Sequence, residues 1–129
     1  MKIDREKIYN KFGGKCAYCG IELNGKFQVD NIIAKERYIN KCMNDEFPEF
    51  LKHLDISDID HIDNLFPSCQ SCNVYKHSYD LEFFRRNISR LIFQLNEHSA
   101  QFRMAKRYGL VNETGIEVEF YFEKVVKDE

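Results

Sequence analysis

Apolar residues recur at helical spacing in the C-terminal half of the chain. Asp80 is of a residue type that commonly caps helices, and it precedes apolar positions that repeat every three or four residues: Leu81, Phe84, Ile88, Leu91, Ile92 and Leu95. Ser99 predicts the cap of a further helix that extends to about Tyr108, and Gly109 predicts its end. The pattern therefore predicts additional helices after residue 80.

Shorter segments predict the other elements. Asp4 predicts the cap of a first helix that reaches about residue 12, where two glycines would end it. Residues 26–33 alternate between polar and apolar side chains and then turn apolar, so they predict a strand. A second short strand is expected over 64–66, a helix over about 69–77, and a closing strand over 117–123 with one face toward water. The predicted fold class is α+β.

An insertion separates the two expected strands. Residues 36–59 carry mixed signals, and within them residues 47–54 predict a helix with a proline in its first turn. Four aspartates then make an acidic loop that extends beyond residue 59: Asp55, Asp58, Asp60 and Asp63. Residues 36–63 are therefore a candidate contact surface for another protein.

Length and composition are those of a globular protein. The chain has 129 residues, of which 43% are hydrophobic and 31% are charged, which allows one domain with a modest core. No apolar run approaches the roughly 20 residues of a membrane span, and the N-terminal residues lack the apolar stretch of a signal peptide. We expect a single domain over residues 1–129 with no membrane contact; the oligomeric state stays open.

The charge of the chain neither indicates nor excludes a nucleic-acid partner. The formal net charge is −2, whereas nucleic-acid-binding domains often carry a basic excess, although a local basic face can supply the same attraction. Basic residues gather in the predicted C-terminal helices: Arg85, Arg86, Arg90, Arg103, Lys106 and Arg107. Such residues usually form a solvated helix face, and the alternative is that some of them follow a DNA backbone.

Four of the five cysteines form two Cys-x-x-Cys pairs, Cys16 with Cys19 and Cys69 with Cys72. Two such pairs in a short chain predict a zinc site with four thiolate ligands, which leaves no open position and is therefore structural. The arrangement fits metal binding in a reducing, cytoplasmic compartment better than disulfides. Cys42 has no obvious partner and is interpreted as a small buried or half-buried thiol.

Around the second cysteine pair the residues resemble a known family. The matching segments are Val29-Asp30-Asn31-Ile32-Ile33, Asn64-Leu65, and a helix with Cys69, Cys72, Asn73 and Lys76. This combination resembles the HNH nuclease family, whose active site is a ββα-metal unit. The Cys16 to Gly20 segment fits the branch of the family that is stapled by a four-cysteine zinc ribbon. The resemblance covers roughly residues 15–86, and the cysteine pairs alone would be far less specific.

The resemblance implies a mechanism and a set of site residues. HNH nucleases use one divalent metal, usually Mg²⁺ or Mn²⁺, to hold the scissile phosphate and stabilise developing charge. By position, Asp30 and Asn73 would be the protein ligands of this metal, and Asn64 would orient the catalytic base. Lys76 would lie near a phosphate, one turn beyond Asn73. Arg85 and Arg86 are the further residues that we assign to the DNA interface.

The chain departs from the family at position 31, where the histidine that acts as general base is replaced by Asn31. A carboxamide has no titratable nitrogen near neutral pH, and losing a general base typically costs on the order of 10²–10⁴ in rate. Three explanations stay open. Asn31 is an introduced, inactivating substitution; or His61, in an Asp-His-Ile tripeptide, acts instead; or the chain is a natural relic that binds without cutting.

The sequence thus favours a metal-dependent HNH-type DNA endonuclease with impaired or abolished activity. The alternative is a non-catalytic, zinc-stapled module that binds DNA or RNA. His53 and His98 are interpreted as surface or satisfied core histidines. So is His77, because a helix-end histidine often only complements the helix dipole, although its place after Lys76 also allows contact with a phosphate.

Overall fold

The computed structural model describes residues 3–34, 47–55 and 57–127. Cys42 and most of the first half of the insertion lie outside the described residues. Contacts divide the chain into two compact units, one of residues 1–81 with 120–129 and one of residues 82–119. The single domain stays a prediction, since compactness alone does not define a domain. A membrane-crossing helix, which needs length and a run of apolar residues, is absent from the part of the chain that the structure describes.

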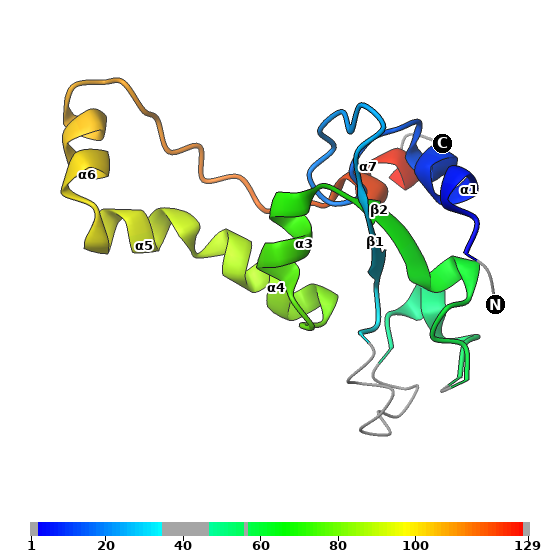
Figure 1. Ribbon diagram of the computed structural model, residues 1–129. Helices are drawn as coiled ribbons and strands as arrows, with labels where there is room; N and C mark the ends of the chain where they lie inside the picture. Colours follow the sequence, from blue (N-terminus) through cyan, green and yellow to red (C-terminus); the bar gives the residue numbers. More distant parts are fainter. Residues whose placement is uncertain (1–2, 35–46, 56, 128–129) are drawn as a thin grey trace. The chain divides into compact units, whose positions relative to one another are not determined.

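The larger unit is built around a two-stranded antiparallel sheet (Figure 1). Strand β1 (Gln28–Asn31) pairs with β2 (Leu65–Ser68), so that Asp30 lies opposite Phe66. Helix α3 (Gln70–Lys76) follows β2 after a single residue, Cys69, whose Sγ accepts the Cys72 amide hydrogen at 3.3 Å. All four residues of β2 are buried. The sheet and the helices around it confirm the α+β class, and they place α3 directly after the sheet.

The N-terminal segment forms as its cap and stop residues predict. Helix α1 (Arg5–Tyr9) continues into the 3₁₀ helix η1 (Asn10–Phe12), and the Asp4 carboxylate accepts the Lys7 amide hydrogen at 3.1 Å. Gly13 has φ +62°, the left-handed conformation that favours glycine after a helix. The ring of Phe12 packs edge-on against Phe66 of β2, at 5.2 Å between centroids. The first helix is thereby attached to the sheet.

The closing strand expected over 117–123 is wrong. Helix α7 (Tyr121–Lys127) begins there, and the Glu123 side chain accepts the Phe120 amide hydrogen at 2.8 Å, as in a helix-capping box. The alternation that suggested a strand has a tertiary cause. Phe120 and Phe122 both pack against Tyr18, with ring centroids 5.4 and 6.3 Å away. Two buried rings at i and i+2 therefore flank a helix start and do not line a sheet.

The described part of the insertion is anchored but only briefly helical. The helix expected over 47–54 is a single 3₁₀ turn, η3 (Glu49–Leu51), which begins after Pro48. Phe47, Leu51 and Leu54 are buried. A second 3₁₀ turn, η4 (Ile62–Asn64), leads directly into β2. These apolar anchors hold the segment that precedes β2 in place.

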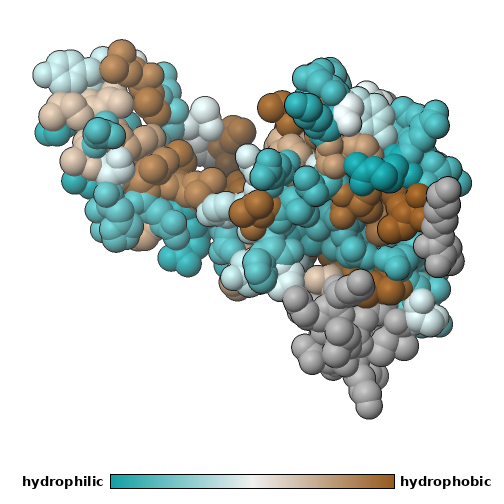
Figure 2. Space-filling view, in the orientation of Figure 1, coloured by the Kyte–Doolittle hydropathy of each residue, from teal (hydrophilic) through white to brown (hydrophobic). Residues whose placement is uncertain are grey.

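The smaller unit contains α5 (Leu91–His98), α6 (Ala100–Arg107) and all but the first residue of α4 (Leu81–Ser89). The Ser99 hydroxyl accepts the Phe102 amide hydrogen at 3.1 Å, as its capping role predicts. Gly109, at φ +75°, closes α6, and the Leu110 amide donates to the Ala105 carbonyl at 2.9 Å in a Schellman arrangement. Neither α5 nor α6 has a buried residue, and apolar side chains are visible on their surface (Figure 2).

Candidate metal centres and active-site pocket

The four predicted zinc ligands converge in the larger unit. The sulfurs of Cys16, Cys19, Cys69 and Cys72 all lie within 4.8 Å of one another. A tetrahedral zinc with sulfurs at about 2.3 Å requires sulfur–sulfur distances of about 3.8 Å, and Cys19 and Cys69 are 3.8 Å apart. The donor set and its spacing fit zinc. Which ion the cluster holds stays a prediction.

Backbone hydrogen bonds shape the knuckle that carries the first cysteine pair. The Cys16 amide donates to the Ile21 carbonyl at 2.9 Å, and the Gly20 amide donates to the Cys16 carbonyl at 3.0 Å. The Ala17 amide donates to the Pro67 carbonyl at 2.9 Å and joins the knuckle to β2. The knuckle therefore faces the start of α3, although the two segments are far apart in the sequence.

The electrostatics of the sulfur cluster favour a bound cation. A hydrogen bond from Cys72 lowers the pKa of Cys16 to about 4, whereas burial raises the pKa of Cys19 to about 11. The pKa of Cys72 is also raised, chiefly by its hydrogen bond with Cys16. The Cys16 thiolate thus forms easily, and its charge opposes ionisation of Cys19 and Cys72. A zinc ion would supply the positive charge that allows all four thiolates to form.

Asp30 lies at the heart of the second candidate site and is almost fully buried. The Lys76 ammonium is 3.2 Å from its Oδ2 atom, and the Tyr18 hydroxyl donates to the same oxygen. Burial raises the pKa of Asp30, and the positive charge of Lys76 opposes this shift. Burial and the negative charge of Asp30 raise the pKa of Tyr18 well above its usual value, so Tyr18 stays a donor. The two donors stabilise the carboxylate form of Asp30.

Lys76 is placed differently from what its sequence position suggested. Its side chain is 0% exposed, and its ammonium contacts Asp30 and the Asn31 carbonyl, the latter at 3.2 Å. A direct phosphate contact stays a prediction, and the burial of Lys76 speaks against it. The sequence spacing correctly put Lys76 one turn beyond Asn73, but it did not reveal that this part of α3 faces the sheet.

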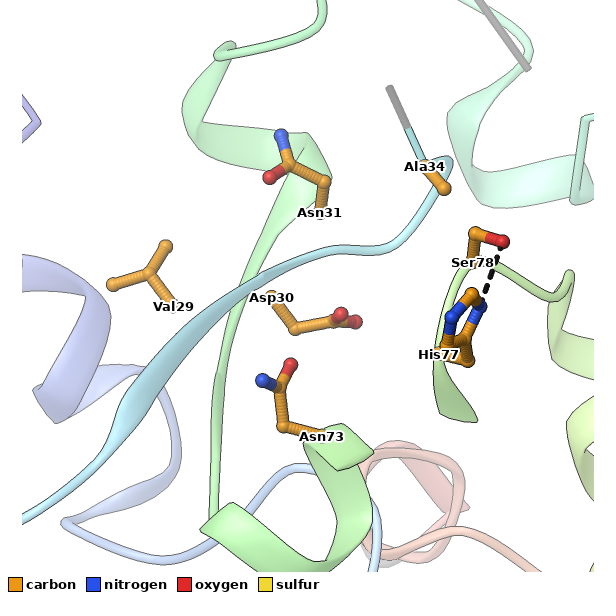
Figure 3. A pocket seen from close by; sticks show the side chains of 7 residues that line it. All are labelled: Val29, Asp30, Asn31, Ala34, Asn73, His77 and Ser78. Carbon is orange, nitrogen blue, oxygen red and sulfur yellow. Dashed lines mark hydrogen bonds between the residues drawn. The ribbon is translucent and has the colours of Figure 1, made fainter. Parts of the chain in front are cut away.

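A pocket of about 280 Å³ adjoins Asp30 (Figure 3). Its lining combines residues from β1, from the loop after it, and from the end of α3: Val29, Asp30, Asn31, Ala34, Asn73, His77 and Ser78. The two predicted ligands of a catalytic metal, Asp30 and Asn73, therefore meet in one cavity. In Figure 3 the Asn73 amide lies beside the Asp30 side chain, with its oxygen turned toward β1. A carboxylate and an amide oxygen are donors that suit a hard divalent cation.

His77 is the pocket residue whose place the sequence analysis missed. Its Nδ1 atom is 3.0 Å from the Ser78 hydroxyl, and its backbone has φ +54° at the end of α3. The signal that could have found it is its spacing from Asn73, since residues four apart share one face of a helix. The interpretation as a helix-end histidine overlooked that this helix end faces the pocket.

Asn31 and Asn64 share one hydrogen-bond acceptor. The side-chain amides of both donate to the Ile59 carbonyl, at 2.8 and 2.9 Å respectively. Asn64 is fully buried, and its Oδ1 atom also accepts the Ile33 amide hydrogen at 2.8 Å. Asn64 thereby fixes the backbone that follows residue 31 and the carbonyl to which the Asn31 side chain donates. Its role in orienting a catalytic base stays a prediction.

The structure does not place His61 in the pocket. Its Nδ1 atom accepts the Asp63 amide hydrogen at 3.1 Å, which makes it the cap of η4. The nearby His53 ring is 2.7 Å from the Asp63 carboxylate. Neither histidine lines the cavity around Asp30. A role for His61 as a substitute base therefore gains no support from its position.

The two arginines assigned to DNA differ in their surroundings. Arg85 is 3.1 Å from Glu82 and donates to the Val118 carbonyl at 3.1 Å, so its guanidinium is engaged within the smaller unit. Arg86 is exposed, and its guanidinium lies 5.8 Å from the Phe83 ring centroid. Arg86 is thus the better placed of the two for a partner in solution.

Comparison with known proteins finds one similar protein that is named as an HNH endonuclease. The chain is 32% identical over 77 residues to a Bacillus subtilis protein named "SPbeta prophage-derived putative HNH endonuclease YoqL". The match covers 60% of this chain and 29% of that protein. No model of a known protein family matches the chain, and no solved structure is significantly similar to it.

Proposed function

We propose that the chain is a metal-dependent endonuclease of the HNH type that hydrolyses phosphodiester bonds in DNA. The observation that carries this function is the meeting of Asp30 and Asn73 in one pocket, on a strand and a helix that belong to a β1–β2–α3 unit. We interpret that unit as a ββα-metal fold, stapled by zinc at the four cysteines. The HNH name of the prophage relative agrees with it.

The Asp30 carboxylate suits a cation despite its existing partners. A carboxylate offers about four acceptor positions, and Tyr18 and Lys76 both contact Oδ2, with Lys76 also 3.5 Å from Oδ1. Oδ1 therefore keeps acceptor capacity for an ion that Asn73 would share. When bound, Mg²⁺ or Mn²⁺ would hold the scissile phosphate and stabilise charge on the leaving oxygen.

Asn31 occupies the position of the general-base histidine, but its carboxamide cannot accept a proton near neutral pH. Its side chain donates to the Ile59 carbonyl at 2.8 Å. A histidine at position 31 would find the same acceptor for one ring N–H, and its other nitrogen would be free to take a proton. The surroundings of residue 31 are therefore ready for an imidazole.

The test compares plasmid nicking by the parent chain and by Asn31→His, with Mg²⁺ or Mn²⁺. We expect Asn31→His to cut faster, by up to about 10²–10⁴ if no other group now serves as base. Asp30→Ala and Asn73→Ala should abolish cutting in both backgrounds. Asn112→His, the same substitution on an exposed residue of the smaller unit, is the matched control and should change nothing. The nuclease function is overturned if no chain cuts any DNA form.

A second candidate function is a non-catalytic module that binds DNA or RNA, which the absence of an imidazole at position 31 favours. It predicts binding that weakens steeply with salt and no cutting by either chain. A further interaction with a protein through residues 36–63, and a cytoplasmic location, complete the proposal. A failure to bind any nucleic acid at low salt would favour the protein partner over both nucleic-acid functions.

A further inference from the structure

We propose, on the basis of the nuclease function above, that His77 is the general base of this chain. Its imidazole would take the proton of the attacking water that a histidine at position 31 would otherwise take. The replacement of that histidine by Asn31 would then have moved the proton acceptor to another wall of the same pocket.

The first observation is the place of the ring. His77 lines the cavity together with Asp30 and Asn73, and its side chain is exposed, so water and substrate can reach it. Its Nδ1 atom is paired with the Ser78 hydroxyl at 3.0 Å, and its Nε2 atom has no hydrogen-bond partner among the residues that the structure describes. Figure 3 shows the Asp30 carboxylate pointing toward the side of the pocket where His77 and Ser78 lie.

The second observation is the backbone of His77. It has φ +54° and ψ −134° at the end of α3, a conformation that glycine adopts easily and other residues adopt at a cost. Such outliers often occur at functional sites, where the surrounding structure enforces them. A histidine at a position that suits glycine indicates that the imidazole itself is used.

The third observation comes from the other candidates. Among the residues that line the pocket, His77 and Asp30 are the titratable side chains, and Asp30 is already held by Lys76 and Tyr18. His53 and His61 contact Asp63 and do not line the cavity. His77 is therefore the group in this pocket that is suited to accept a proton.

The step balances with one water molecule. If Nδ1 carries its hydrogen and donates it to the Ser78 hydroxyl, the Nε2 lone pair is free to take a proton from water. The water oxygen then forms a bond to phosphorus, and the bond from phosphorus to the leaving sugar oxygen breaks. The leaving oxygen is protonated from solvent, and the imidazolium returns its proton to solvent, so that one phosphodiester and one water yield a phosphate monoester and an alcohol.

The experiment is a cycle of four chains: the parent chain, His77→Gln, Asn31→His, and the double variant. Nicking of plasmid DNA with Mn²⁺ is measured for each. We expect His77→Gln to lower the rate about 10²–10⁴-fold in the parent background, and less than about tenfold in the Asn31→His background, where the introduced imidazole supplies a base. His98→Gln, in the smaller unit, is the matched control and should cut like the parent chain.

The outcomes separate this inference from the nuclease function. A His77→Gln variant that cuts as well as the parent chain overturns the role of His77. So does an equal loss in both backgrounds, which would indicate a metal ligand or a structural residue. If Asn31→His cuts and the parent chain does not, the nuclease function stands and the role of His77 falls. If no chain cuts, both fall.

A second variant guards against a folding artefact. His77→Gly suits the backbone conformation at this position, so it should melt at or above the temperature of the parent chain. It should lose cutting as His77→Gln does, and added imidazole should restore part of the rate. Retention of full activity by the glycine variant would overturn the inference.

Discussion

The two candidate metal sites of the larger unit differ in whether the protein's own side chains balance their negative charge. The cysteine cluster holds four like donors within 4.8 Å, and the charge of Cys16 raises the pKa values of Cys19 and Cys72. The pocket instead holds the Asp30 carboxylate, already paired with an ammonium and a hydroxyl. The first site is incomplete without a cation, whereas the second is electrostatically balanced without one.

The two ions would therefore have different roles. An ion at the cluster would join the 16–19 knuckle to the start of α3, and so its binding free energy would become folding free energy. An ion at the pocket would compete with Lys76 for Asp30 and would bind weakly and reversibly. The same helix, α3, thus carries predicted ligands of a structural ion near its start and of an exchangeable ion further along.

The largest expected effect follows from breaking the staple. Cys72→Ser, or a strong chelator, should remove zinc and with it the cooperative melt. Structural zinc contributes an apparent 10–16 kcal/mol in zinc-finger peptides, of the order of the whole stability of a typical domain, about 5–15 kcal/mol. Metal analysis and thermal melting test this. Cys42→Ser, which removes a cysteine outside the two pairs, is the control. A cooperative melt without bound metal would contradict the prediction.

The next effect tests whether the Lys76 ammonium balances the charge of the Asp30 carboxylate in the pocket. Lys76→Met keeps the length of the side chain but leaves Asp30 buried without its cation, which should cost about 3–5 kcal/mol in urea unfolding. Adding Asp30→Asn should recover part of this loss, because the uncompensated charge is then gone. A cost near zero for Lys76→Met would mean that the ammonium is free in solution and available to a phosphate.

A smaller effect is expected from Asn64, whose hydrogen bonds hold the backbone beside the pocket. Asn64 is fully buried and bonds to both the Ile33 backbone and the Ile59 carbonyl. Asn64→Ala should leave these groups unsatisfied and cost about 1–3 kcal/mol for such a group. The exposed Asn112→Ala is the matched control. If the two alanine variants unfold at the same urea concentration, the hydrogen bonds of Asn64 do not stabilise the backbone beside the pocket.

Local chemistry explains what could be predicted from the sequence. The caps at Asp4 and Ser99 and the stop at Gly109 depend on neighbouring residues, and the spacing of the paired cysteines alone predicts that their sulfurs converge. The meeting of Asp30 and Asn73 in one pocket could be expected because the family resemblance supplies a long-range contact that spacing does not contain.

Tertiary contacts explain what could not be predicted. The alternation of Phe120 and Phe122 suggested a strand because the sequence does not show that both rings pack on Tyr18. The burial of Lys76 depends on Asp30, which is 46 residues away. His77 was assigned to a helix end, and only the cavity shows that this end faces the pocket.

The smallest effect concerns Arg86, whose contact with DNA would require neither of the two ions. Arg86 is exposed, whereas Arg85 is bound to Glu82 and to the Val118 carbonyl. If the smaller unit contacts DNA, Arg86→Gln should reduce the salt dependence of binding by about one phosphate contact, a change of about 0.9 in the slope of log K against log salt concentration. Arg85→Gln should change the slope less, because its guanidinium already has partners. Binding is measured on uncut DNA in Ca²⁺ or without metal, over a range of salt. Equal slopes for the parent chain and Arg86→Gln would show that this arginine is not in the interface. If adding Ca²⁺ changes the DNA affinity more than Arg86→Gln does, the affinity comes mainly from the pocket.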